Sequence, residues 1–154
     1  RVPRGTHAVV GAAMRAQMEK VSGCDELADE PGEGEIETIP LGSGAMLALL
    51  PCGSGAYNIN SVPFVIRGGK AAPADIDYAG DATNAAAMLT NAWWEAETSV
   101  LATHAKGRGI GDCGEDARYA WDGKGFRLIE MRVMSTCRGS VNWLRVWKAE
   151  PVYR

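Results

Sequence analysis

Four cysteines, at positions 24, 52, 113 and 137, constrain the fold of this 154-residue chain more than any other feature. No two form a Cys-x-x-Cys pair, the spacing typical of four-thiolate zinc sites and thioredoxin-like motifs. Of the three connectivities we expect the sequence-local one, Cys24–Cys52 with Cys113–Cys137. Each bridge would stabilise the fold by about 3–4 kcal/mol. The alternative is four buried free thiols in a cytosolic protein, whereas disulfides indicate a periplasmic or extracellular location.

The first seven residues, Arg1 to His7, contain neither an initiator Met nor the charged and apolar regions of a signal peptide. They resemble a thrombin-cleavable tag linker. We therefore expect a mature or excised piece of a longer protein, with residues 1–7 as a tag or linker remnant. Residues 8–154 are expected to form a single domain, because domains commonly run about 100–150 residues.

Charge and composition exclude several classes of function. The formal net charge of −3 gives no electrostatic basis for binding a polyphosphate backbone, so no nucleic-acid partner is expected. No apolar run approaches the roughly 18 residues that a membrane span requires. The chain has only two histidines, which argues against a histidine-rich metal centre. We expect neither a metal nor a cofactor.

Two acidic segments contain possible metal ligands, but neither has the spacing of a known metal-binding motif. Residues 25–37 are rich in Asp and Glu but do not follow the EF-hand spacing, and a solvated loop explains them better. Asp75, Asp77 and Asp81 lie among turn residues, with no neighbouring His and no calcium-loop pattern. Both segments are therefore predicted to be loops.

Hydrophobic periodicity predicts one helix followed by strands. Over residues 8–22, with Thr6 as N-cap and Gly23 at the C′ position, one apolar stripe contains Val10, Met14, Met18 and Val21. Strands are expected at 36–41, 45–52, 56–67, 88–94, 99–104, 119–121, 126–134 and 143–152. The predicted fold class is α+β, with the N-terminal helix packed on a twisted, mainly antiparallel sheet of about six to eight strands.

The stretch Lys106–Gly114 combines four glycines with two cations, an acid and a cysteine. Residues 109–114 match the dinucleotide fingerprint G-x-G-x-x-G, but that fingerprint requires a helix opening at its third glycine. Here the chain continues into a hairpin, so the match is accidental. The glycines are expected to let the chain turn around a Cys113–Cys137 bridge, which would place Arg108 and Arg138 on neighbouring loops.

A catalytic set is hard to assemble from this sequence. Neither Ser43 nor Ser54 completes the G-x-S-x-G elbow, and His104 is the one credible imidazole base. We therefore favour a non-enzymatic binding module for a glycan, an envelope component or a protein, with inhibition of a cell-wall hydrolase as one form of that function. The predicted binding residues on exposed loops are Tyr57, Asn58, Arg108, Asp112, Arg138 and Trp143.

Two alternatives remain open at this point. The first is a cell-envelope hydrolase that uses His104 and Asp112 as acid and base. The second is a structural or assembly subunit, including a homo-oligomer. Adjacent strand residues face opposite sides of a sheet, so either Trp93 or Trp94 would supply the contact.

Several of these segments, taken together and in order, resemble a known bacterial family. They are Pro51–Asn58, Lys106–Gly114, Tyr119–Leu128, and Cys137–Ser140 followed by Trp143 and Trp147. The combination is similar to the C-terminal region of the domain of unknown function 1176, from about residue 8 to about residue 149. Members look like exported proteins about twice this length, so the resemblance implies disulfides and a periplasmic location. It implies no activity and no catalytic residues.

Overall fold

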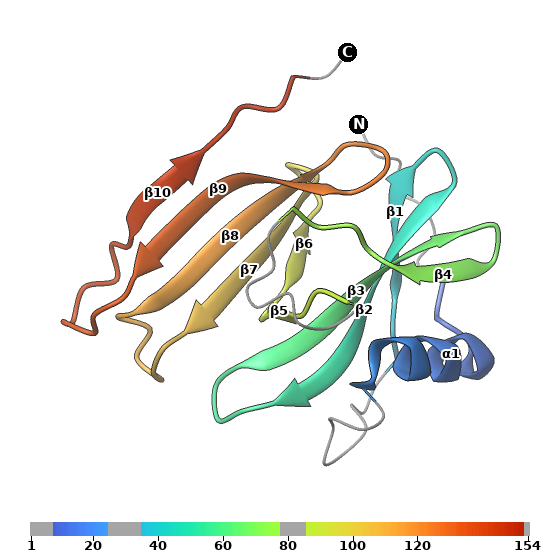
Figure 1. Cartoon of the computed structure of the whole chain (residues 1–154), viewed down its shortest axis with the longest axis horizontal. Helices are drawn as coiled ribbons and strands as arrows, with labels where there is room; N and C mark the ends of the chain where they lie inside the picture. Colours follow the sequence, from blue (N-terminus) through green and yellow to red (C-terminus); the bar gives the residue numbers. More distant parts are fainter. Residues whose placement is uncertain (1–7, 25–34, 78–85, 153–154) are drawn as a thin grey trace.

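The computed structural model describes residues 8–24, 35–77 and 86–152. Thr6, the acidic residues 25–34 and Asp81 lie outside the described residues. Within them the chain forms one helix and ten strands (Figure 1). The elements are α1 (Ala12–Ser22), β1 (Thr38–Gly42), β2 (Ala45–Ser54), β3 (Ile59–Arg67), β4 (Lys70–Pro73), β5 (Leu89–Thr90), β6 (Trp93–Glu95), β7 (Val100–Lys106), β8 (Gly114–Trp121), β9 (Phe126–Met134) and β10 (Leu144–Lys148).

The strands form two antiparallel sheets of five, so the single sheet of six to eight strands was wrong. The first sheet has the order β1-β2-β3-β4 with β5 also paired to β3, and the second has the order β10-β9-β8-β7-β6. The division occurs inside the strand predicted at 88–94. Asn91 has a φ of 44°, which interrupts the extended backbone. Residues before it join the first sheet and residues after it join the second.

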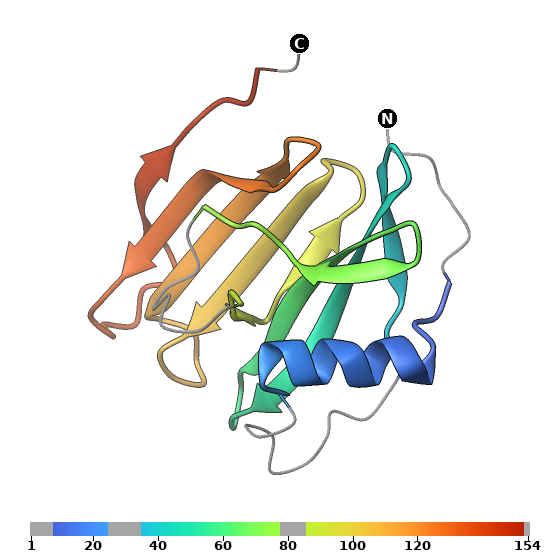
Figure 2. The same cartoon turned by 45° about the vertical axis from the view of Figure 1, so that its right-hand side comes forward.

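The helix covers one face of the first sheet (Figure 2). Met18 is fully buried in a core that also contains Leu50 and Phe64. The helix ends at Gly23, whose φ of 73° is the left-handed conformation that favours glycine at this position. The predicted Cys24–Cys52 disulfide is confirmed and joins the end of α1 to β2. Val21, predicted on the buried stripe, is exposed instead.

A second core lies between the two sheets. Leu47 of the first sheet packs in the same cluster as Leu101, Tyr119 and Phe126 of the second. β2 contributes to both cores because its side chains alternate between them, which explains its continuous apolar sequence. The strand predicted at 45–52 is therefore present, and it is covered on both faces.

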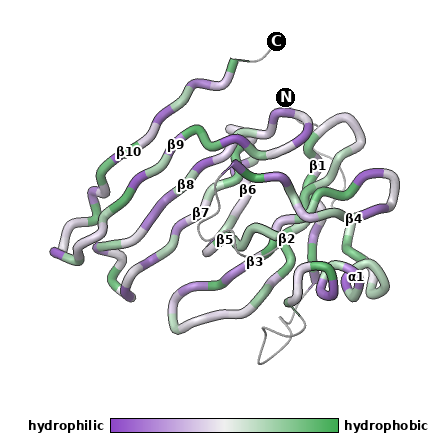
Figure 3. Tube along the Cα trace, in the orientation of Figure 1, coloured by the Kyte–Doolittle hydropathy of each residue, from purple (hydrophilic) through white to green (hydrophobic). Residues whose placement is uncertain are grey.

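The second sheet has an outer face, defined as the side chains of β6–β9 that point away from the first sheet. Leu101 and Tyr119 point into the inter-sheet core, and their neighbours along the strands point outward. The outward positions of β7–β9 include His104, Asp116 and Arg132. Hydrophilic segments accordingly recur along β8 and β9 in Figure 3. This face, with the loops at one end of it, contains the candidate site.

Candidate functional site

The Gly-rich loop and the segment after β9 form one corner of the second sheet. The predicted Cys113–Cys137 disulfide is confirmed and joins them. Asp112 is only 1% exposed, and its carboxylate accepts hydrogen bonds from Arg108 Nε at 2.6 Å and from the Gly139 N–H at 2.6 Å. These contacts, with Arg108 the largest cause, lower the pKa of Asp112 to about 2. The ionised carboxylate therefore stabilises the fold above its ordinary pKa of 3.8, and this stabilisation is lost as the pH falls towards 2.

The loop after β2 lies against this corner. Asn58 Nδ2 donates to the Lys106 carbonyl at 2.9 Å, and the Lys106 N–H donates to Asn58 Oδ1 at 3.2 Å. The Tyr57 hydroxyl donates to the Gly107 carbonyl at 3.2 Å. The structure thus brings together the three loops that contain predicted binding residues: Tyr57 and Asn58, Arg108 and Asp112, and Arg138. However, Asn58, Arg108 and Asp112 already bind other parts of the chain, whereas Arg138 lies exposed at the same corner.

His104, the predicted base, pairs with Asp116 on the neighbouring strand, while the Asp112 carboxylate binds Arg108. The hydrogen bond joins His104 Nδ1 to Asp116 Oδ1. On the same ring, the indole of Trp143 stacks with centroids 4.8 Å apart and planes 9° from parallel. Trp143 is buried, and its Nε1 has no hydrogen-bond partner within the described residues. Of the predicted binding residues, Trp143 therefore adjoins His104 directly.

A cleft of about 400 Å³ opens on the outer face beside His104. Its lining comes from four adjacent strands and consists of Trp93, Ala102, Thr103, His104, Asp116, Arg118, Glu130 and Arg132. Trp93 is 43% exposed there, whereas Trp94 packs into the inter-sheet core, so the two tryptophans do face opposite sides. The cleft thus combines an aromatic ring with charged groups on a regular sheet.

Ion pairs neutralise most charges around the cleft. Arg118 Nη1 donates to Glu95 Oε1 at 2.7 Å, and this guanidinium lowers the pKa of Glu95. Arg132 Nε donates to Glu130 Oε1 at 2.6 Å. Within the described residues, both terminal nitrogens of Arg132 and the Oε2 atom of Glu130 form no hydrogen bond. Donors and acceptors therefore remain available for a ligand.

Sequence reasoning missed the charged lining residues Asp116, Arg118, Glu130 and Arg132, and it named Trp93 only as a contact in an assembly. A signal was present, because Asp116 and Arg118, and likewise Glu130 and Arg132, stand two positions apart, which is the period of one strand face. The antiparallel register then places Asp116 opposite Arg132 and Arg118 opposite Glu130. That register depends on pairing across the sheet, which the sequence pattern did not supply.

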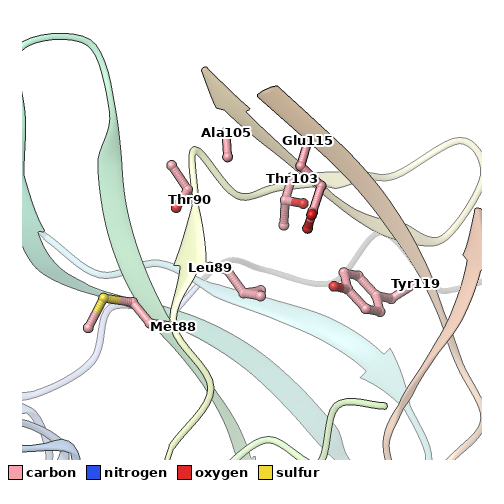
Figure 4. Close-up of a pocket in the computed structure, with 7 residues that line it drawn as sticks. All are labelled: Met88, Leu89, Thr90, Thr103, Ala105, Glu115 and Tyr119. Atoms are coloured by element: carbon pink, nitrogen blue, oxygen red, sulfur yellow. The ribbon is translucent and has the colours of Figure 1, made fainter. Parts of the chain in front are cut away.

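A smaller cavity of about 120 Å³ lies between the two sheets (Figure 4). The Glu115 carboxylate points into it near Thr103, with Leu89 and Tyr119 on the far side. Burial raises the pKa of Glu115. This half-buried acid belongs to the inner face of β8.

The Asp-x-Asp segment binds a guanidinium. Arg127 donates to Asp75 Oδ2 and Asp77 Oδ1, each at 2.8 Å, and to Asp122 Oδ2 at 2.7 Å. Hydrogen bonds from the Gly125 N–H and from Arg127 lower the pKa of Asp122 to about 2. Arg127 therefore occupies the position between these carboxylates that a cation would take. Another group of potential ligands, Asp112 with Cys113 and Cys137, has both sulfurs in the disulfide.

Comparison with known proteins identifies the family. The chain matches the family described as "Protein of unknown function (DUF1176)" over residues 3–150. It is 30% identical over 127 residues to a protein of Escherichia coli (strain K12) described as "Uncharacterized protein YpfG", which covers 77% of this chain. The chain spans 36% of that relative's length. No solved structure matches, and no helix of the described residues is long and apolar enough to cross a membrane. The chain belongs to the DUF1176 family.

Proposed function

We propose that this chain is an exported binding module and that its ligand site is the cleft on the outer face of β6–β9. One observation supports this most: an exposed tryptophan and unused polar atoms converge in an open cleft. Its volume of about 400 Å³ lies within the roughly 300–1,000 Å³ usual for small-molecule sites. The two disulfides favour export, since such bonds persist in oxidising compartments.

The arrangement favours binding because the lining is held in place before a ligand arrives. The lining residues stand on hydrogen-bonded antiparallel strands, with one shift of the β8–β9 register after Arg118, and ion pairs hold Arg118 and Arg132. Trp143 supports the lining residue His104 by stacking on its ring, and the disulfide anchors the segment that carries Trp143. A site fixed in this way loses little conformational entropy on binding. The corner loops with Arg138 would then form the rim of the cleft.

The proposal is tested by mapping ligands on the protein by nuclear magnetic resonance. Pools of soluble envelope fragments, containing glycans, peptides and lipid headgroups, are added to ¹⁵N-labelled protein. We expect shifts centred on Ala102, Thr103 and Asp116, and their loss in Trp93→Ala. The matched control is Trp147→Ala, which removes another exposed tryptophan, on β10, outside the cleft. Shifts that map to another surface, or that persist in Trp93→Ala, would reject the cleft as the site.

A second candidate function is hydrolysis of an envelope polymer. The hydrogen-bonded pair of His104 and Asp116 in an open cleft favours it, since a carboxylate that orients an imidazole is a common acid/base arrangement. Release of reducing ends from purified envelope polysaccharide would reveal such activity. We expect His104→Ala to abolish it if it exists, and a fully active variant would remove this candidate.

A further inference from the structure

We propose that the cleft recognises a neutral saccharide, with Trp93 as the stacking platform and Arg132, Glu130 and Asp116 as the hydroxyl-binding groups. This inference rests on the proposed function, because it names the ligand class of the same site. It is argued from the charge balance of the lining, from the hydrogen-bonding atoms left over and from the exposed aromatic ring.

The charged side chains around the cleft already have partners. Arg118 pairs with Glu95 and Arg132 with Glu130, and the Asp116 carboxylate is hydrogen-bonded to the His104 ring. A ligand carrying a net charge would have to displace one partner from a pair or leave a charge without compensation, and desolvating an uncompensated charge is costly. A neutral polar ligand meets neither obstacle. The pairing therefore favours uncharged ligands.

The atoms that remain free alternate between donors and acceptors. Arg132 stands opposite Asp116 in the β8–β9 register, and Glu130 lies two positions along the same strand face. The guanidinium of Arg132 can only donate, whereas the two carboxylates can only accept when ionised. A hydroxyl group can do both: it accepts from Arg132 and donates to a carboxylate. Neighbouring hydroxyls on a sugar ring match such a row of alternating groups without disturbing the ion pairs.

The aromatic ring supplies the apolar component. Trp93 is 43% exposed and lies on β6, the edge strand of the second sheet, at the border of the cleft. The flat indole offers a surface for the C–H face of a sugar ring while the hydroxyls point to the charged row. Because the ring lies at an edge, a ligand of several sugar units can extend beyond the cleft.

The experiment compares tetramers of matched length and different charge by isothermal titration and by nuclear magnetic resonance. Cellotetraose and chitotetraose are the neutral probes, tetragalacturonate is the anionic probe and tetralysine is the cationic and peptide probe. We expect the neutral probes to shift cleft resonances, with an affinity that changes little with salt. Trp93→Ala should weaken that binding about tenfold, given the usual strength of aromatic contacts. Arg132→Gln should also weaken it, and Trp147→Ala should leave it unchanged.

The outcomes separate the two proposals. If only the anionic or the cationic probe shifts the cleft, the assignment of a neutral saccharide is wrong and the binding site stands. If the neutral probes bind equally well to Trp93→Ala, the proposed stacking platform is wrong. If neither these probes nor the mixed envelope pools perturb the cleft, both proposals fail. Thermal unfolding of each variant checks that it is folded, which is expected because Trp93 and Arg132 are exposed.

Discussion

The two sheets have the same number of strands but differ in what covers them. The first sheet has α1 on one face and the second sheet on the other, whereas the hydrophobic core that the described residues of the second sheet build lies on its inner face. The difference is visible in sequence: Leu47 and Ala48, adjacent on β2, are both fully buried, in different cores. On β8 the buried Ala117 lies between the charged Asp116 and Arg118. The comparison shows why the second sheet has an open face, where the proposed binding site lies, whereas both faces of the first sheet pack in cores.

The largest contrast between the sheets should be in stability. Leu47→Ala removes a fully buried side chain from the inter-sheet core and should lower the free energy of unfolding by about 2–5 kcal/mol. Glu130→Gln breaks a partly exposed ion pair on the outer face and should lower it by less than about 1 kcal/mol. Urea denaturation of both variants measures the difference. Equal losses in the free energy of unfolding would contradict the expectation that the outer face stabilises the fold less than the inter-sheet core.

The two disulfides should differ in function more than in stability. Replacing both cysteines of either pair with serine should lower stability by about 3 kcal/mol, because the bridges close loops of similar length, with sequence separations of 28 and 24. Only the Cys113/Cys137 double variant should also weaken binding in the cleft, since that bridge anchors the segment carrying Trp143. Denaturation and titration with the same probe test both statements. Equal binding by the two double variants would show that the position of Trp143 does not affect binding in the cleft.

The smallest effect concerns the inner face of the second sheet. Burial raises the pKa of Glu115 above its ordinary value of 4.5, so the folded protein favours the protonated acid. This contribution to stability is complete below the ordinary pKa and is lost as the pH rises through the raised one. Glu115→Gln should therefore be slightly more stable than the parent at pH 7, and the gain should shrink as the solution is acidified. Exposed Glu97→Gln is the control; a gain independent of pH would contradict the argument.

Local patterns in the sequence predicted the local structure well. The existence and the end of the single helix and the bounds of the strand at 126–134 were predicted correctly, whereas the helix begins at Ala12, with Gly11 as its N-cap, and not at residue 8. Both disulfides were also predicted, because each joins segments close in the chain. Each of these features depends on residues within about 30 positions of one another, where periodicity and turn chemistry carry the information.

The features that depend on pairing between distant segments were not predicted. The residue type at position 91 did not indicate a break in the strand expected at 88–94. In the structure the positive φ of Asn91 interrupts that strand, and β5 and β6 belong to different sheets. Its side chain also bonds the Asn58 Oδ1 and the His104 carbonyl, and so links the sheets there. The charged row of the cleft likewise requires the β8–β9 register. Sequence spacing alone indicates which residues share one face of a strand, but not which residues of the adjacent strand lie opposite them.

Gly114, at the start of β8, has a consequence for how this protein can change by mutation. Its φ is 142°, and a methyl group added there would lie 1.9 Å from the Ala105 carbonyl oxygen and 3.0 Å from the Trp143 ring. A substitution would therefore disturb the β7–β8 pairing and the indole stacked on His104 in a single step. No change of the surrounding side chains can relieve the first clash, because the obstructing atom is backbone. Position 114 is thus restricted to glycine by the backbone of β7, and any substitution there would also displace Trp143.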